Sequence, residues 1–337
     1  MNKDISSSWI NLAHHRLGTK VLYATDDFFG EKENLIKPGR GIYVPDKYTD
    51  RGKWMDGWES RRKRVEGNDY CDIKLGLPGI IEGLDIDTNH FLGNHPPFAS
   101  VEATYDNNIV ENTKWTEILT QSPLKAGSQN IFEISNGQKW KYVRLHIYPD
   151  GGVARFRVYG TPAIDWDEKK NVEKIDLASI LNGGRVVLCN DMFFSDKNNL
   201  IMPGPGINMG DGWETRRKRA KKLGDPLDPD WAILSLGKPG IISEAEIDTS
   251  HFVGNFPDCA SLEGLFLGES DNNIIKSLPD LTDKDWSPLL PKTKLNPDYK
   301  HLFEKEIQSI GKISHVRIRI YPDGGVSRLR LWGKPTF

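Results

Sequence analysis

Apolar and polar residues alternate with a period of two in the most strongly patterned segments of the chain. Every second residue is apolar in "YVRLHIY" (142–148), and "RFRVYG" (155–160) shows the same alternation. This is the period of a half-buried β-strand, and a helical period is weak throughout the sequence. The "PDGG" between the two runs predicts the Asp-Gly turn of a hairpin.

The patterned segments occur twice along the chain. "DGWESRRKR" (56–64) is answered by "DGWETRRKR" (211–219). In the same way, "IDTNHF" recurs as "IDTSHF", and "YPDGGVARFRVYG" recurs as "YPDGGVSRLRLWG". Similarity that runs over nearly the whole chain, with shifts only between these motifs, indicates a duplicated module.

The duplication and the strand pattern together predict an all-β protein of two tandem jelly-roll β-sandwich domains. We expect the first domain over residues 1–164, a charged linker over 165–175, and the second domain over 176–337. Each domain would have its long loops at one end of the sheets, where small ligands usually bind.

The composition excludes several classes of binding partner and structural framework. With 45 Lys and Arg against 47 Asp and Glu, the net charge of −2 is too close to neutral for a general polyanion binder. The three cysteines form no CxxC pair, so neither a disulfide framework nor a zinc knuckle is indicated. No stretch approaches the roughly 18–20 apolar residues that span a bilayer. We expect a soluble cytoplasmic protein without nucleic-acid or membrane partners.

The duplicated nine-residue motif is the first candidate for chemistry. It could be a solvated charged loop that a tryptophan anchors to the core. However, its Trp-Glu and Arg-Arg pairs are the same in both copies, although the flanking residues differ. Two parallel guanidinium donors suit a small carboxylate, and a neighbouring glutamate could form one wall of a pocket. The candidates in the two copies are Glu59, Arg61 and Arg62, and Glu214, Arg216 and Arg217.

The second candidate is an Asp-x-x-His segment that precedes a Gly-Asn turn in both copies. It supplies Asp87, His90 and Asn94 in the first copy, and Asp248, His251 and Asn255 in the second. A histidine can act as general acid or base, and a carboxylate can fix its tautomer. Residues i and i+3 point to opposite faces of a straight strand, so the pair could meet only where the strand bulges or ends. The alternative is a histidine that is satisfied within the core.

The remaining motifs give weaker signals. Turn formation alone accounts for the aspartate of "PDGG". The exchange of His146 for Arg319 indicates that the two copies need not be functionally equivalent. The sequence contains no HExxH or clustered His and Cys spacing, and therefore no metal site is predicted. Serine-hydrolase and nucleotide-binding motifs are also missing.

Taken together, the three doubled motifs resemble the allantoicase family over essentially the whole chain. The resemblance implies two jelly-roll domains similar to galactose-binding sandwiches. It also implies a hydrolase of purine (allantoin) catabolism and nitrogen salvage, which acts on C–N bonds other than peptide bonds, in linear amidines. Such an enzyme converts allantoate and water to ureidoglycolate and urea.

The implied substrate has a central carbon that bears a carboxylate and two ureido groups, which assigns a role to each candidate. The four arginines Arg61, Arg62, Arg216 and Arg217 would hold the carboxylate, and Asn94 and Asn255 the ureido groups. Proton transfer would fall to His90 or His251 with Asp87, Asp248, Glu59 or Glu214. No cofactor is predicted, and dependence on a divalent metal is left open. The sequence also leaves open whether the protein forms a homo-oligomer and whether one or both copies carry a site.

The rival hypothesis is a non-catalytic tandem module that binds carbohydrates or anions. It predicts exposed aromatic platforms in the end loops, built from residues such as Trp54, Trp115 and Trp286. It does not require the histidine and carboxylate positions that both copies share.

Overall fold

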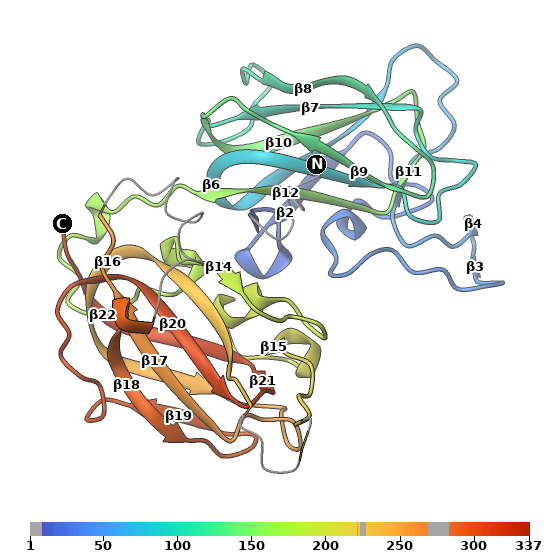
Figure 1. Ribbon diagram of the computed structural model, residues 1–337. Helices are drawn as coiled ribbons and strands as arrows, with labels where there is room; N and C mark the ends of the chain where they lie inside the picture. The colour runs from blue at the N-terminus through green and yellow to red at the C-terminus, as the bar shows by residue number, and fades with distance from the viewer. Residues whose placement is uncertain (1–8, 221, 223–226, 269–282) are drawn as a thin grey trace. The chain divides into compact units, whose positions relative to one another are not determined.

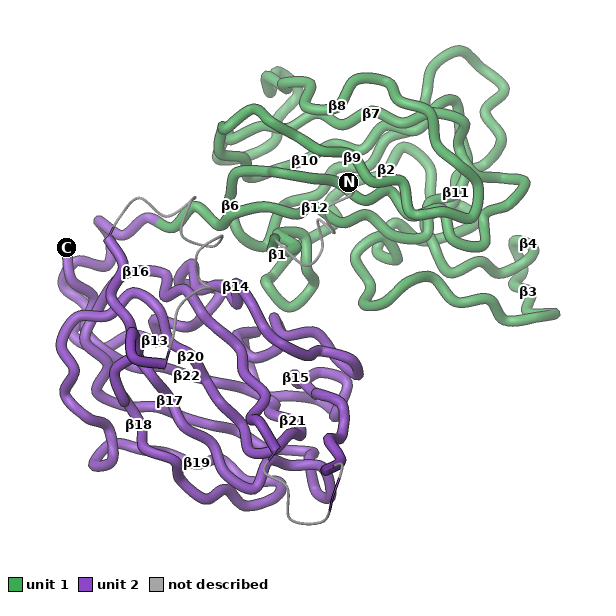
Figure 2. Tube along the Cα trace, viewed as in Figure 1, with its two compact units in different colours: residues 1–164 green, residues 165–337 purple. Residues whose placement is uncertain are grey.

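The computed structural model describes residues 9–220, 222, 227–268 and 283–337, and within these ranges all regular structure is β-strand or short 3₁₀-helix. The chain divides into two compact units, residues 1–164 and 165–337 (Figure 2). The segment 165–175, which the sequence predicts as a linker, lies with the second unit. It contains the 3₁₀-helix η3 (Asp167–Lys169) and the first residue of strand β13 (Ile175–Asp176).

The first unit is built around an eight-stranded sheet of order β1-β12-β6-β10-β7-β8, and β2 and β9 also pair with β6 (Figure 1). Short pairs of strands, β3 with β4 and β5 with β11, lie outside this sheet. The elements are β1 (Ile10–Asn11), η1 (His15–Leu17), β2 (Lys20–Ala24), η2 (Lys32–Ile36), β3 (Tyr48–Thr49), β4 (Gly52–Lys53), β5 (Trp58–Glu59), β6 (Asp69–Asp87), β7 (Phe98–Thr104), β8 (Thr116–Pro123), β9 (Gln129–Glu133), β10 (Lys139–Tyr148), β11 (Gly152–Val153) and β12 (Arg155–Pro162).

The second unit repeats this topology, with the order β13-β22-β16-β20-β17-β18 and with β14 and β19 paired to β16. Its described part contains no counterpart of the β3–β4 pair. After β13, its elements are η4 (Ile180–Asn182), β14 (Arg185–Cys189), η5 (Lys197–Ile201), η6 (Met209–Asp211), β15 (Trp213–Glu214), β16 (Asp230–Asp248), β17 (Cys259–Leu265), η8 (Asp283–Asp285), β18 (Ser287–Lys294), β19 (Lys300–Phe303), β20 (Ile313–Tyr321), β21 (Gly325–Val326) and β22 (Arg328–Pro335).

The long strand β6 organises the first unit because it changes partners along its length. Its first part pairs with β2 and β10, and its second part pairs with β9 and β12. The change falls near Gly76, Pro78 and Gly79, where ladder pairing is irregular. A strand that takes part in two sets of pairings in this way is typical of a sandwich corner, and β16 does the same in the second unit.

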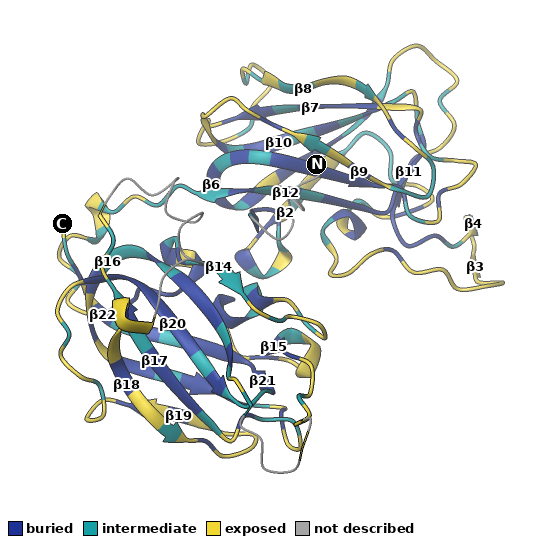
Figure 3. Cartoon of the chain, in the orientation of Figure 1, coloured by how far each residue is buried: buried dark blue, intermediate teal, exposed yellow. Residues whose placement is uncertain are grey.

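The predicted alternation places the core correctly. Val143, Leu145 and Ile147 of β10 are completely buried, whereas Arg144 and His146 between them are half-buried. Along both units, buried residues concentrate in the long central strands, and the loops are exposed (Figure 3). Burial of these apolar side chains is the main favourable contribution to folding.

The predicted hairpin at "PDGG" is wrong. Strand β10 pairs with β6 and β7, whereas β12 pairs with β6 and β1. Alternation shows which face of a strand is buried but not which strand lies beside it. The turn instead leads into β11, which pairs with β5 of the nine-residue motif. The Asp150 carboxylate also accepts a hydrogen bond from the backbone N–H of Lys63 at 2.8 Å, so the loop holds this motif in place.

Candidate active site

The tryptophan of the nine-residue motif fixes the glutamate beside it. Trp58 is completely buried, and its indole N–H donates to the backbone carbonyl of Asp26 at 2.8 Å. Trp213 makes the same bond to Asp191 at 2.8 Å in the second unit. Gly57 allows this close packing, since a Cβ there would lie 2.6 Å from both the Phe91 ring and the Val153 carbonyl. The sequence therefore places the following glutamate at a rigid edge.

The structure brings together two predicted residues, the glutamate and the asparagine, in both units. The Asn94 amide donates to the Glu59 carboxylate at 2.6 Å, and Asn255 donates to Glu214 at 2.6 Å. Burial raises the pKa of Glu59, and the hydrogen bond from Asn94 opposes this shift. Carboxyl groups that transfer protons in enzymes are often buried in this way, so that their pKa is raised.

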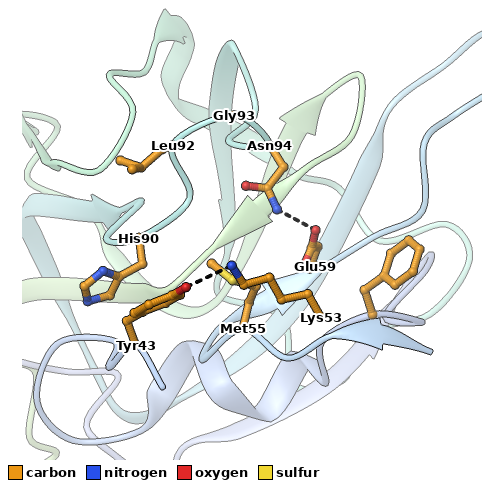
Figure 4. A pocket seen from close by; sticks show the side chains of 9 residues that line it. Tyr43, Lys53, Met55, Glu59, His90, Leu92, Gly93 and Asn94 are labelled. Carbon is orange, nitrogen blue, oxygen red and sulfur yellow. Dashed lines mark hydrogen bonds between the residues drawn. The ribbon is translucent and has the colours of Figure 1, made fainter. Parts of the chain in front are cut away.

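The Glu59–Asn94 pair forms part of a pocket of about 470 Å³ in the first unit. Figure 4 shows this pair on one side of the pocket and the His90 and Tyr43 rings on another. The pocket also contains the Lys53 ammonium group, which donates to the Tyr43 hydroxyl at 2.9 Å. Its lining residues are Phe29, Tyr43, Lys53, Met55, Glu59, His90, Leu92, Gly93 and Asn94.

His90 reaches this pocket because β6 ends three residues earlier, at Asp87. His90 has a left-handed backbone with φ of +68°, which turns the chain away from the strand direction. Its exposed ring lies 5.8 Å from the Tyr43 ring, measured between centroids. The pocket thus holds three candidates that the sequence singled out: Glu59, His90 and Asn94.

Asp87 does not join His90. Both Asp87 carboxylate oxygens accept hydrogen bonds of 2.8 Å from the Arg40 guanidinium, and one of them also accepts the Asn89 backbone N–H. Asp87 is 1% exposed. In the described structure no hydrogen bond links it to His90. Such a bidentate pair holds the end of β6 against the segment that carries Arg40, so the geometry gives Asp87 a structural setting.

Asp248 has a different environment in the second unit. It accepts the Ser250 backbone N–H at 2.8 Å, and the Lys300 ammonium lies 4.0 Å from its carboxylate. The position that corresponds to Arg40 is Pro205. Asp248 makes no hydrogen bond to His251 in the described structure.

The arginine pairs do not line the pocket that contains Glu59 and His90. Arg61 binds the Asp26 carboxylate at 2.6 Å, and Arg216 binds Asp191 at 2.8 Å. Both guanidinium groups also lie over phenylalanine rings. Arg61 and Arg62 line a separate cavity of about 550 Å³. Phe29 lines both this cavity and the pocket that contains Glu59.

In the second unit, the cavity beside Glu214 and Asn255 is lined by Arg217. His251 is not among its lining residues. The His251 ring nitrogen Nε2 instead donates to the Gly206 backbone carbonyl at 2.9 Å, since a carbonyl oxygen can only accept.

The two copies differ in which side chain binds one backbone carbonyl near the histidine. In the first unit, the Asn89 side chain donates to the Gly41 carbonyl at 2.8 Å. In the second unit, the matching residue is Ser250, and His251 occupies the equivalent carbonyl, that of Gly206. The asparagine thus leaves His90 available to the pocket, whereas His251 is used in a structural contact.

Tyr43 and Lys53 were missed by the sequence reasoning, which favoured positions that both copies share. They lie in residues 43–55, between Ile42 and Asp56, where the second copy has only residues 208–210. The difference in length is the signal that could have found them. An extra segment next to a motif that is otherwise the same in both copies is a place where the copies can differ in function.

The three tryptophans of the rival hypothesis form no exposed platform. Trp286 is 6% exposed and lies under Arg317, Trp115 is half-buried under Arg144, and Trp54 is half-buried under the Lys47 ammonium. A non-catalytic carbohydrate module is therefore not favoured.

No group of three or more His, Cys, Asp or Glu side chains among the described residues is arranged to hold a metal ion. None of the described helices is long and apolar enough to cross a membrane. The need for a cofactor or metal stays an open prediction.

Fold and site together define an all-β, tandemly duplicated protein with a pocket for a small molecule in its first unit, in which apolar side chains surround a few polar and ionisable groups. The family model described as "Allantoicase repeat" matches residues 10–163 and 175–336. The chain belongs to the allantoicase family.

Similar proteins cover nearly the whole chain. "Probable allantoicase 1" of Burkholderia mallei is 46% identical, over 98% of this chain and 96% of its own length. A "Probable allantoicase" of Pseudomonas fluorescens is 47% identical, over 97% and 96%. The crystal structure of an allantoicase from Saccharomyces cerevisiae has a TM-score of 0.80 at 36% identity, over 98% of this chain and 95% of that one.

Proposed function

We propose that this protein hydrolyses allantoate to ureidoglycolate and urea, in purine (allantoin) catabolism and nitrogen salvage. Membership of the allantoicase family supports the substrate and the reaction. The structural observation that carries the proposal is the first unit's pocket, which Glu59, Asn94 and His90 all line. The reaction makes this protein a hydrolase of C–N bonds in linear amidines.

We place the reaction in the first unit. Glu59 and Asn94 form the same pair there as Glu214 and Asn255 form in the second unit. However, only the first unit adds an available histidine, because His251 is bound to the Gly206 carbonyl. In this proposal the second copy of the motif has a structural role.

The residues suit the bond changes of the reaction. A water oxygen bonds to the central carbon, the bond from that carbon to one ureido nitrogen breaks, and a proton reaches the departing nitrogen. Glu59, with its raised pKa, is suited to give that proton, and His90 is suited to take one from water. The Asn94 amide nitrogen is bonded to Glu59, which leaves its oxygen to accept from a ureido N–H.

The proposal includes a small-molecule substrate, a cytoplasmic location, and no nucleic-acid or membrane partner. It includes no organic cofactor. Self-association and metal dependence are part of the test. Light scattering gives the oligomeric state, and turnover after treatment with a chelator, with and without added divalent ions, gives the metal requirement.

The deciding experiment follows both products of the purified protein with allantoate. The proposal predicts equal amounts of urea and ureidoglycolate, formed at a rate proportional to the protein concentration. If no urea appears in the presence or absence of added divalent ions, the proposed function is wrong.

A further inference from the structure

The segment 43–55, which only the first repeat contains, is a folded hairpin. Within it β3 pairs with β4, with Tyr48 opposite Lys53. The backbone N–H of Trp54 donates to the Lys47 carbonyl at 2.9 Å, and the Lys47 ammonium lies 3.6 Å from the centre of the Trp54 ring. These contacts close the hairpin, and Lys53 is an exposed residue at its end.

Lys53 supplies the only permanently cationic side chain among the nine residues that line the pocket. Its ammonium donates to the Tyr43 hydroxyl and lies 4.9 Å from the centre of the Tyr43 ring. No ion pair joins Lys53 to a carboxylate within the described residues, whereas Arg61 is paired with Asp26. Figure 4 shows the Lys53 ammonium and the Tyr43 hydroxyl meeting inside the pocket.

The arrangement leaves two groups, the Lys53 ammonium and the Tyr43 hydroxyl, that can donate hydrogen bonds to an anion. An ammonium group has three N–H donors, and only one is used by Tyr43. The Tyr43 hydroxyl accepts from Lys53 and can still donate its own proton. Two donors that converge from neighbouring residues suit the two oxygens of a carboxylate. None of the arginines that the sequence predicts for this task lines this pocket.

We propose that Lys53, assisted by Tyr43, binds the carboxylate of the substrate and selects ureido acids over uncharged ureido compounds. This inference rests on the proposed function. It places the carboxylate at the Lys53–Tyr43 side of the pocket and the departing ureido group near Glu59 and Asn94. The second repeat has no counterpart of either donor, because residues 208–210 replace the whole hairpin.

The test compares Lys53→Met, which keeps the length of the side chain but removes its charge, with Lys53→Arg and Tyr43→Phe. Lys139→Met is the matched control, because Lys139 is an exposed lysine of the same unit that does not line the pocket. Loss of one charged hydrogen bond that is made equally in the ground and transition states should raise KM about 10- to 100-fold and leave kcat within about threefold. Lys53→Arg should restore part of the affinity, and Lys139→Met should match the wild type.

Two small probes separate charge recognition from general binding. Hydantoate carries one ureido group and a carboxylate, and hydantoamide replaces the carboxylate with an uncharged amide. The wild type should bind hydantoate at least about tenfold more tightly than hydantoamide, and Lys53→Met should lose this preference. Circular dichroism and the Tm show whether each variant is folded.

The outcomes separate this inference from the proposed function. If the wild type hydrolyses allantoate and folded Lys53→Met keeps the wild-type KM, the inference is wrong and the function stands. If the wild type releases no urea, the function is wrong. Calorimetry with hydantoate then decides the inference alone: binding that needs Lys53 supports an anion site, and the absence of binding overturns it.

Discussion

The buried carboxyl group of Asp85 predicts a pH dependence of stability that a single substitution should remove. Asp85 lies in β6, is 2% exposed, and accepts one hydrogen bond of 2.7 Å from Gln129. Its other oxygen is buried with no hydrogen-bond partner. Burial raises the pKa of Asp85 from 3.8 to about 6, although the Gln129 hydrogen bond opposes the shift.

The direction of the pH dependence follows from the difference in proton binding at Asp85 between the folded and unfolded states. Between pH 4 and 6 the folded state keeps a proton at Asp85 that the unfolded state has lost, so the free energy of unfolding falls as pH rises. The loss of stability that comes from ionising buried Asp85 is fully present well above pH 6 and absent well below pH 4. At about 1.4 kcal/mol per pKa unit, it reaches roughly 3 kcal/mol, of which about 2 kcal/mol develops between pH 4.5 and 7.5.

The perturbation is Asp85→Asn, and the assay is guanidinium unfolding of the full chain at pH 4.5 and 7.5. The unfolding free energy of the variant, relative to that of the wild type, should be about 2 kcal/mol higher at pH 7.5 than at pH 4.5. Comparing the two pH values cancels any constant effect of the new amide group. Glu246→Gln, at the half-buried matching position of the second unit, controls for general loss of negative charge. A variant difference that is the same at both pH values would refute the reasoning.

Three other predictions concern the pocket and its support. Arg40→Met should destabilise the first unit by about 3 kcal/mol in denaturant unfolding, because Asp87 is left buried without its partner; an unchanged midpoint would contradict this. Asn89→Ser should lower kcat without unfolding the protein, because it frees the Gly41 carbonyl and His90 can then bind it, as His251 binds the Gly206 carbonyl in the second unit; kcat equal to the wild type would exclude this role. In the wild type, the hydrogen bond from Asn94 lowers the pKa of Glu59. Asn94→Ala removes this bond and should therefore move the Glu59 inflection in the pH profile of kcat/KM to higher pH; a shift to lower pH would contradict this.

Periodicity and the internal repeat predicted much of the fold. The alternation in β10 gave its buried face, and the doubled motifs gave the tandem all-β architecture. Strand neighbours were harder, because pairing depends on where β6 changes partners rather than on any local pattern. This is why the turn at "PDGG" was taken for a hairpin.

In the site, too, the sequence predicted some residues but not their contacts. Glu59 and Asn94 are 35 positions apart, and their residue types made them candidates, but only the fold shows that they bond to each other. Asp87 and His90 are close in sequence, yet Asp87 is bound to Arg40, which lies 47 positions earlier. Lys53 was not predicted as a site residue because it lies in a segment without a counterpart in the other copy.

The central claim is that the first unit's pocket performs the hydrolysis. The most direct test is urea release from allantoate by Glu59→Gln and by its matched control Glu214→Gln, each checked for folding. The account predicts that Glu59→Gln loses about 100-fold or more in kcat, the size of a general acid's contribution, and that Glu214→Gln stays within about threefold of the wild type. Full activity in Glu59→Gln, or a dead Glu214→Gln, would contradict it.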